Sequence, residues 1–370
     1  MRLRAWNFET RHPADVSGLA ALLASGALDP RDVLCVLGKT EGNGGRNDFT
    51  RDLAMGAYEQ LLGPLLGCAP GEVQDRVIFS FSGGTEGVVT PHAVVFAREG
   101  DPLDARQADK RLAATVGATR AFEPWEIGRM PQVLETARAV RALVAGLKVD
   151  GPGDVHLVQM KGAIPTVTEA ARREAEARGL SLRCDMVFSR AASALGVALA
   201  LGEVSEDALS DAVICRDWSL FSGVASCSAK PGLGRTELLV FGNSAYATGE
   251  LKIAHGVLDD ILDVAGVEAV MRRAGVDPAR VRHDPDERAK IVGIFAKSEA
   301  DPRGAVRGRR NTMTVDDDIS DTRYSRCVLA SVLAATTGET RVYVSTRAEH
   351  HGPLGGGPLA MVVRAEGASR

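Results

Sequence analysis

The sequence predicts an α/β protein, and two observations lead to that prediction. Apolar segments typical of strands alternate with segments of helical periodicity along all 370 residues. A set of polar residues, in the order Lys, Arg, Ser, also occurs once in each third of the chain. Hydrophobic residues make up 45% and charged residues 25%, which provides enough apolar material for a sizeable folded core.

The expected elements can be taken in order along the chain. Helices are predicted where apolar residues recur every three to four positions, at 14–26, 51–63, 133–147 and 258–267. Strands are predicted where short apolar runs end in polar or glycine-rich turns, at 32–40, 75–87, 93–99, 111–122, 154–162, 236–244, 288–300, 341–346 and 360–366. The segment 208–216 fits either pattern. Linkers are expected near 100–110 and 245–255.

Charge and cysteine usage exclude several classes of protein. The net charge of −4 argues against a general nucleic-acid binder, which needs a basic excess to contact phosphates. No apolar run approaches the roughly 18 residues of a membrane span, and the N-terminal segment has no apolar core of a secretory signal. The six cysteines are dispersed without metal-binding spacing, as reduced thiols are in cytosolic proteins. We therefore expect a cytoplasmic protein without a nucleic-acid or membrane partner.

The repeated set has the same surroundings each time. A lysine ends an apolar run at Lys39, Lys161 and Lys297. An arginine follows an aromatic and a hydroxyl residue and opens an Ala/Leu-rich helix that ends at glycine, at Arg51, Arg190 and Arg326. A serine closes a downstream strand at Ser82, at Ser226 or Ser228, and at Ser345. A lone strand-end lysine is ordinarily a solvated terminus, but three such sets in one order are hard to ascribe to chance.

This set of residues can perform nucleophilic catalysis on a carbonyl. Serine becomes a nucleophile when a base takes its proton, and a lysine can do so if burial and neighbouring cations lower its pKa. Three arginines would supply those cations, and backbone N–H groups after the serines could stabilise an oxyanion. Such a pocket suits a small, flat, carbonyl-rich molecule, best one with near threefold symmetry. Because one carbonyl reacts at a time, we expect one deprotonated lysine and two cationic ones.

The residues that carry this set resemble the cyanuric acid amidohydrolase and barbiturase family of ring-opening amidohydrolases. The resemblance covers nearly the whole chain and rests on GKTEGNGGRNDFTR (38–51), SGGTEGVVTPHAVVFAR (82–98), VQMK (158–161), SRAASALGVALALGE (189–203), AKSEADPRGAVRGRRNTM (296–313) and VSTRAEHHGPLGGGP (344–358). It implies three similar α/β units, 1–104, 105–250 and 251–370, arranged with pseudo-threefold symmetry around a central active site. It also implies a homotetramer.

The resemblance assigns roles to the repeated residues. Lys161 would be the base and Ser228 or Ser226 the nucleophile, with Ser228 favoured by counting from the other units. Substrate-binding roles would fall to Lys39, Arg51, Ser82, Gly83, Arg190, Ala229, Lys297, Arg326, Ser345 and Thr346, with Arg323 as a rival to Arg326. The middle serine block departs from the family pattern, because the resemblance implies that PGLGRT is inserted before Glu237.

The resemblance also implies a structural cation and no organic cofactor. Mg²⁺ or Ca²⁺ would be held near the third unit by hard oxygen ligands. The positions concerned are Glu299, Ala348, His351, Gly352, Pro353 and Gly356. His351 stands where the family usually has glutamine, and the pair His350-His351, taken by itself, is expected on the surface.

The expected activity is hydrolysis of cyanuric acid to carboxybiuret, which should lose CO₂ to give biuret. Two alternatives remain at this point. One is a barbiturase that opens barbituric acid to ureidomalonic acid. The other is a non-catalytic protein that binds small cyclic imides, which would keep the arginines but need no lysine of lowered pKa.

Overall fold

The computed structural model describes residues 1–45, 47–314 and 319–365. Within these residues the strands form three four-stranded sheets and one two-stranded ribbon. The first sheet contains β1 (Arg2–Glu9), β2 (Val33–Thr40), β3 (Ile78–Gly83) and β4 (His92–Glu99). The second contains β5 (Arg111–Ala118), β6 (Val155–Ile164), β7 (Ala225–Pro231) and β8 (Glu237–Ser244). The third contains β9 (Leu251–Leu258), β10 (Ile291–Ser298), β13 (Val342–Thr346) and β14 (Gly357–Arg364), while β11 (Ala305–Val306) and β12 (Arg309–Arg310) form the ribbon.

The three sheets share one topology. Their strand orders are β1-β4-β2-β3, β5-β8-β6-β7 and β9-β14-β10-β13, so the last strand of each unit always lies between the first and the second. In each sheet the second strand pairs in parallel with the third, and a helical connection joins these two strands. This threefold repetition of an α/β unit is the predicted fold class.

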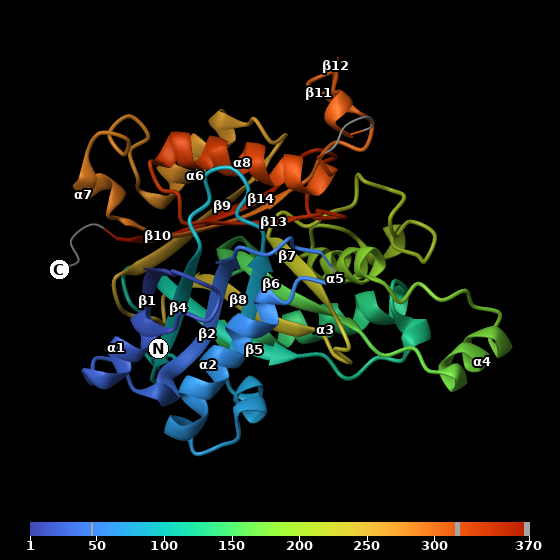
Figure 1. Ribbon diagram of the computed structural model, residues 1–370, viewed down its shortest axis with the longest axis horizontal. Helices are drawn as coiled ribbons and strands as arrows, with labels where there is room; N and C mark the ends of the chain where they lie inside the picture. The colour runs from blue at the N-terminus through green and yellow to red at the C-terminus, as the bar shows by residue number, and fades with distance from the viewer. Residues whose placement is uncertain (46, 315–318, 366–370) are drawn as a thin grey trace.

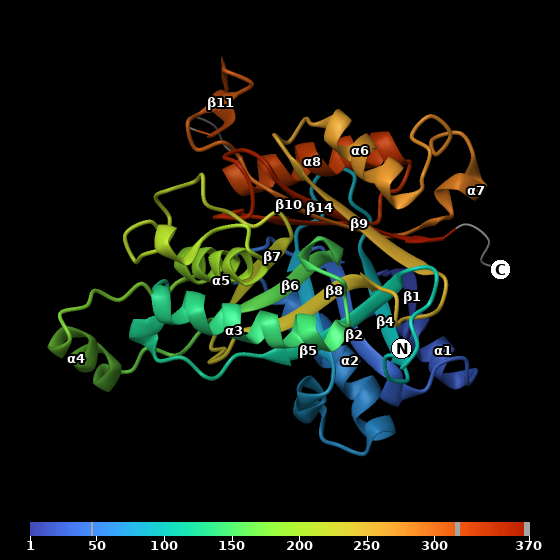
Figure 2. The same ribbon diagram turned by 180° about the vertical axis from the view of Figure 1, so that it is seen from behind.

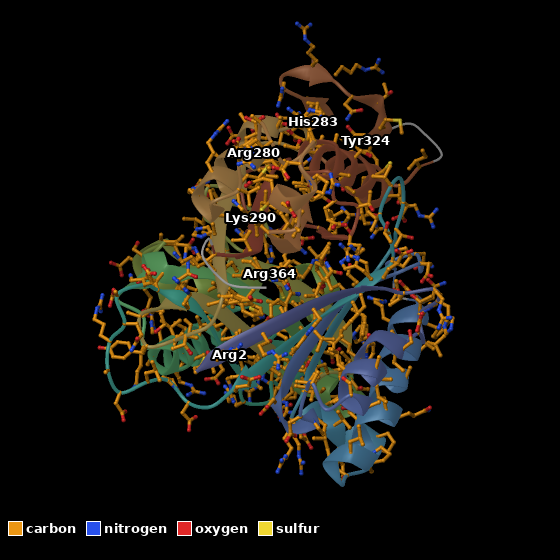
Figure 3. The ribbon with its side chains drawn as sticks, turned by 90° about the vertical axis from the view of Figure 1, so that its left-hand side faces the viewer. Arg2, Arg280, His283, Lys290, Tyr324 and Arg364 are labelled. Carbon is orange, nitrogen blue, oxygen red and sulfur yellow. The ribbon has the colours of Figure 1, made fainter. Side chains whose placement is uncertain are left out.

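The helices are α1 (Ser17–Ala24) and α2 (Thr50–Leu66) in the first unit, α3 (Met130–Leu147), α4 (Glu169–Ala177) and α5 (Met186–Leu201) in the second, and α6 (Val264–Ala274), α7 (Pro285–Arg288) and α8 (Asp321–Thr337) in the third. The longer helices α2, α3, α5, α6 and α8 pack on the sheets, whereas α4 projects away from them (Figures 1 and 2). Each unit also has its own apolar cluster, which lies between sheet and helices in the first and third units and between α3 and α5 in the second. The outer layer of the third unit carries charged side chains such as Arg280 and Lys290 (Figure 3).

The inner faces of the sheets meet in one apolar core that draws on all three units. Phe96 of β4 lies 4.9 Å from Phe241 of β8 and 6.2 Å from Phe295 of β10, measured between ring centroids. Because buried aromatic rings dominate core packing, this cluster fixes the sheets around a common axis. The third-strand ends of all three sheets are thereby brought to the same place.

Two features of the repeated helices follow the sequence expectation. The helices α2, α5 and α8 carry the repeated arginines in their first two turns, and each is followed by a glycine in the left-handed conformation, at Gly67, Gly202 and Gly338. Glycine adopts this conformation without a Cβ penalty, so it ends the helix. Among the described residues no helix combines the length and the apolarity needed to cross a membrane.

The structure corrects the sequence-based elements at several places. The linker expected near 245–255 is confined to 245–250, because β9 begins at Leu251 and pairs with β14 over its whole length. The helix expected at 258–267 begins only at Val264. Strands β1 and β7 were not predicted, since arginines interrupt the apolar pattern of the first and the second is rich in small polar residues. The ambiguous segment 208–216 forms turns, and Glu366 of the strand expected at 360–366 lies outside the described residues.

Candidate active site

The structure places the three lysines and three serines in the same register. Lys39 of β2 lies opposite Ser82 of β3, and Lys297 of β10 lies opposite Ser345 of β13. In the second unit Lys161 of β6 lies opposite Ser228 of β7.

The register separates the two candidate serines of the middle unit. Ser226 lies opposite Gln159, one pleat deeper in the sheet, and is buried. Side chains two residues apart on a strand share a face, so Ser226 lies beneath Ser228 on the same side. Of the two serines, Ser228 is the one that lines the central cavity.

A cavity of about 290 Å³ lies at the ends of these strands. It is lined by residues of all three units, among them most of the predicted substrate-binding residues: Arg51, Ser82, Gly83, Arg190, Ala229, Arg326, Ser345 and Thr346. The lysines Lys39 and Lys297 lie behind the serines, fully buried. The sequence prediction missed further lining residues, namely Asn43, Gly44, Gly45, Phe81, Met186, Val187, Thr322 and Arg347. Several of these lie just before or at the start of the arginine-bearing helices, which was the available signal.

The third arginine of the cavity is Arg326. Its side chain is 2% exposed, whereas that of Arg323 is 52% exposed and does not line the cavity. Arg326 lies one turn further into α8, on the face toward the sheet.

Each lysine reaches the neighbouring unit in a cyclic pattern. Lys39 donates to the carbonyl oxygen of Val344 at 2.9 Å, Lys161 to that of Phe81 at 2.9 Å, and Lys297 to that of Cys227 at 2.8 Å. In every case the acceptor is the residue before the neighbouring unit's serine. Lys39 and Lys297 also donate to their own serines, at 3.1 and 3.4 Å. The units therefore interlock through the same groups that form the site.

Burial lowers the pKa of all three lysines, because the charged ammonium loses its hydration. The pKa of Lys161 falls to about 7, with Arg51 and Lys230 contributing after burial. The pKa of Lys297 falls to about 8, with burial and then Arg190 as causes. The pKa of Lys39 lies well below its usual value, through burial and Arg326. The expectation of one deprotonated and two cationic lysines stays a prediction, since a pKa of about 8 still leaves Lys297 mostly cationic at pH 7.

Two of the arginines are held by carboxylates from a neighbouring unit. Arg326 donates to both oxygens of Glu86 at 2.6 and 2.7 Å, and Arg190 to both oxygens of Glu349 at 2.8 and 2.7 Å. Each of these glutamates stands four residues after a serine of the repeat. Gly84, with φ of +101°, leaves room for Arg326, because a Cβ there would lie 2.2 Å from the guanidinium carbon. Such two-point pairs fix the direction of the guanidinium toward the cavity.

The second unit lacks the equivalent carboxylate. Glu237 is the first residue of β8 and lies opposite Lys161, as His92 lies opposite Lys39 in β4. By register Glu237 thus corresponds to His92 and not to Glu86. The insertion of PGLGRT relative to the family pattern stays a prediction. The position four residues after Ser228 is Gly232.

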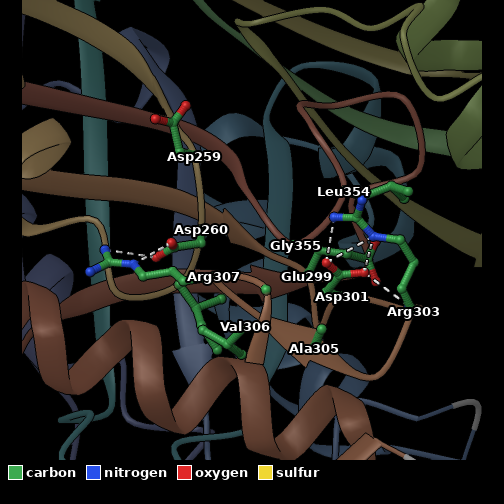
Figure 4. A pocket seen from close by; sticks show the side chains of 12 residues that line it. Asp259, Asp260, Glu299, Asp301, Arg303, Ala305, Val306, Arg307, Leu354 and Gly355 are labelled. Carbon is green, nitrogen blue, oxygen red and sulfur yellow. Dashed lines mark hydrogen bonds and ion pairs between the residues drawn. The ribbon is translucent and has the colours of Figure 1, made fainter. Parts of the chain in front are cut away.

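The residues predicted to hold a cation fit that role only in part. A second cavity, of about 350 Å³, lies beside Glu299 and is lined by four acidic side chains (Figure 4). Arg303 and Arg307 each lie 2.6 Å from one of these acids, Asp301 and Asp260 respectively. Among the residues that the structure describes, no three His, Cys, Asp or Glu side chains converge as around a metal ion.

The two adjacent histidines are not on the surface, contrary to expectation. Both are fully buried. The two ring nitrogens of His351 are engaged by the Cys227 N–H at 3.0 Å and the Glu349 carbonyl at 2.7 Å, so the imidazole has no free nitrogen for a metal ion. Within the predicted set, Glu299 is the one residue whose side chain offers oxygen atoms to a metal ion. Its pKa is raised to about 7 by burial and by Glu349, and one of its oxygens accepts from the Ala348 N–H at 2.7 Å.

Known proteins are similar to this chain over nearly its full length. Residues 5–364 match the family described as amidohydrolase ring-opening protein. A cyanuric acid amidohydrolase of Bradyrhizobium diazoefficiens is 46% identical, with 96% of each chain covered. A cyclic amide hydrolase of Azorhizobium caulinodans is 44% identical, with 95% of this chain and 97% of the relative covered.

A solved structure shares the fold as well as the sequence. It is described as "Cyanuric acid hydrolase: evolutionary innovation by structural concatenation", and it superimposes with a TM-score of 0.89 at 43% identity, covering 98% of this chain and 99% of the other. The chain therefore belongs to the family of ring-opening amidohydrolases.

Proposed function

We propose that this protein opens the ring of cyanuric acid by hydrolysis, with Ser228 as nucleophile and Lys161 as base. The observation that carries the proposal is the shared strand register of one lysine–serine pair in each unit, whose three serines line one cavity. A ring with three equivalent carbonyls matches such a site, because each carbonyl can meet the same groups. The names of the similar proteins support the same substrate.

The first half of the reaction forms a covalent intermediate. The Ser228 oxygen attacks one ring carbonyl while the Lys161 amine takes the hydroxyl proton. Lys161 suits this role because, with a pKa of about 7, much of it is neutral at neutral pH. The C–N bond of the tetrahedral intermediate then breaks, and the ammonium of Lys161 returns the proton to the leaving ring nitrogen.

The second half of the reaction releases the serine. A water molecule gives a proton to Lys161 and attacks the acyl carbon, and Ser228 leaves with that proton. One water is consumed, and the product is carboxybiuret, which loses CO₂ to give biuret. Arg51, Arg190 and Arg326 together bring positive charge to the cavity, which favours the carbonyl oxygens as they gain negative charge.

The three units divide the work in this proposal. We assign them to 1–104, 105–250 and 251–370, each giving one lysine, one serine and one arginine. Ser82 and Ser345, with Lys39 and Lys297 behind them, bind the two carbonyls that do not react. Gly83, Ala229 and Thr346 follow the serines in all three units and contact the ring edges.

The test is the loss of cyanuric acid, followed by its ultraviolet absorbance with micromolar purified protein. No loss of substrate would sink the proposal. Ser228→Ala should abolish turnover, whereas Ser226→Ala should retain it, because Ser226 lies beneath the cavity. If both variants keep near-normal turnover, the nucleophile is not in the middle unit, and Ser82 or Ser345 becomes the better assignment.

Assays with barbituric acid distinguish the proposed function from the two alternatives, a barbiturase and a non-catalytic imide binder. Barbituric acid differs from cyanuric acid by a CH₂ in place of an NH, and a site that accepts a hydrogen bond from that NH rejects the analogue strongly. Side-by-side assays should show the higher kcat/KM for cyanuric acid. A non-catalytic imide binder would bind both compounds and turn over neither. Its Lys161→Ala variant would bind them as tightly as the wild type does.

A structural cation is a separate proposal. Glu299 would hold Mg²⁺ or Ca²⁺ together with backbone carbonyls of the 348–356 loop, and the raised pKa of Glu299 supports it, because a nearby cation would relieve the crowding of two buried carboxyls. Elemental analysis of purified protein, with thermal unfolding before and after chelation, tests this. The proposal of a structural cation would be contradicted if the purified protein contained no metal and neither Mg²⁺ nor Ca²⁺ changed its unfolding temperature.

A further inference from the structure

The ring of arginine–carboxylate contacts around the active site is open at one position. Arg190 and Arg326 each meet a glutamate four residues after a serine of another unit. By the same rotation Arg51 would meet the residue four after Ser228, which is Gly232. Gly232 lies in a turn with φ of +86° and open space around it, so no carboxylate is supplied there.

Arg51 has no close two-point partner within residues 1–45, 47–314 and 319–365. One of its terminal nitrogens donates to the Gly45 carbonyl at 2.5 Å, and its Nε lies 3.7 Å from Asp48. The Asp48 carboxylate itself accepts from the N–H of Gly44 at 2.8 Å and from the N–H of Thr50 at 3.0 Å. A guanidinium has five N–H donors, so Arg51 keeps donors for a further acceptor.

A second cation lies where the carboxylate is missing. The strand β7 continues its pairing to Pro231, opposite Ile164, whereas β3 stops at Gly83. This extension brings Lys230 to the neighbourhood of Arg51, and its ammonium lies 3.6 Å from the sulfur of Met55. The second unit therefore differs from the other two in two ways at this place: it lacks the carboxylate, and it has a lysine in addition.

The two cations line a cavity of about 220 Å³ together with Lys161. Its remaining walls include Phe79, Phe81 and Pro231, which supply no negative charge to balance the cations. Arg51, Phe81 and Ala229 also line the substrate cavity, so the two cavities adjoin. The lining has one carboxylate, Asp52, whose side chain is exposed.

We propose that this cavity binds a small planar oxyanion, of the carboxylate or bicarbonate class, between Arg51 and Lys230 and beside Lys161. The guanidinium edge presents two parallel N–H groups that match two oxygens on one carbon, and the ammonium adds a point charge. The bound anion takes the place that a glutamate fills beside Arg190 and Arg326. The cavity volume of about 220 Å³ leaves room for such an anion together with water.

The anion also regulates the proposed reaction, a part of the inference that rests on Lys161 as the base. The groups that face Lys161 are Arg51, Lys230, Glu237 and Cys227, and the two cations favour its neutral form. An anion between those cations offsets them and raises the pKa of Lys161. Formate should therefore slow turnover near pH 7 and lose this effect at a pH well above the raised pKa.

The test is equilibrium binding of ¹³C-formate, followed by NMR line broadening at constant ionic strength. Wild type should bind formate. Lys230→Met should bind it about tenfold to a hundredfold more weakly, because a charge-assisted contact is lost. Lys230→Glu should not bind it, since its own carboxylate would fill the cavity. The matched control is Lys252→Met, on β9 and outside the cavity, which should bind as wild type does.

Further arms identify the source of the anion and guard against misfolding. If ¹³C-bicarbonate competes with formate, the site is supported and the CO₂ released by the reaction is one source of the anion. If formate binds and bicarbonate does not compete, the site is supported as one for carboxylates from outside the reaction. If a Lys230 variant does not fold, a wild-type crystal soaked in formate should show the anion between Arg51 and Lys230. Equal binding by wild type and Lys230→Glu, no binding by wild type, or no anion in that crystal would overturn the inference. Because binding needs no turnover, formate binding by a protein inactive on cyanuric acid would refute the proposed function alone.

Discussion

The proposed base makes a quantitative prediction about pH. With a pKa of about 7, Lys161 is about half neutral at pH 7, whereas a solvated lysine with the usual pKa of 10.5 would be neutral in about one molecule in 3,000. Reaction through Lys161 requires the neutral amine. We therefore expect kcat/KM for cyanuric acid to be constant above about pH 8 and to fall about tenfold for each pH unit below about 7.

Variants assign this limb of the profile to one residue. Lys161→Ala should lose roughly 10²–10⁴-fold in kcat, the range for a lost acid–base group, and the limb near pH 7 should disappear with it. Added methylamine should restore part of the rate, with a limb at the pKa of the added amine. Lys252→Ala, the same change on the outer part of the third sheet, should keep both rate and profile.

The same pH profile also distinguishes Lys161 from Lys297 as the base. If Lys297 were the base, the limb would lie near pH 8, since the pKa of Lys297 is lowered only to about 8. A Lys161→Ala variant that keeps the limb near pH 7 and loses less than tenfold in rate would show that Lys161 takes no proton in the reaction.

The remaining predictions concern stability and assembly. Glu349→Gln leaves Arg190 buried without its carboxylate, so the free energy of unfolding from urea titration should fall by about 3 kcal/mol, while the control Glu250→Gln, in an exposed pair, should cost under about 1 kcal/mol. His156 and His255 touch through their Nδ1 atoms at 2.8 Å, and burial lowers the pKa of each to about 4. Between about pH 6.5 and 4 the unfolded chain binds more protons than the folded protein. The free energy of unfolding should therefore fall as the pH falls, by up to about 1.4 kcal/mol per pH unit for each histidine, and His255→Gln should flatten that slope. Light scattering should give a homotetramer, four times 39.0 kDa; a monomer would contradict the implied assembly.

The sequence alone showed the repeated residues of the candidate site but not their geometry. The order of lysine, arginine and serine in each third, and the helices that follow the arginines, were visible as local patterns, and the structure confirms both. Local periodicity failed for β1 and β9, because their burial depends on strands β4 and β14, far along the chain. No pattern within one segment reports such a partner.

Only the tertiary structure decided which serine of the middle unit reaches the cavity. Ser226 and Ser228 point to the same side of β7, so the choice depends on the register with β6, which packing of the whole unit sets. The pairs that hold the arginines and the carbonyls that hold the lysines likewise join different units, as Arg326 and Glu86 do across 240 positions of sequence. A sequence specifies its residues and its local periods, whereas contacts between distant segments, and the pKa of a lysine buried among them, exist only once three units have closed around one axis.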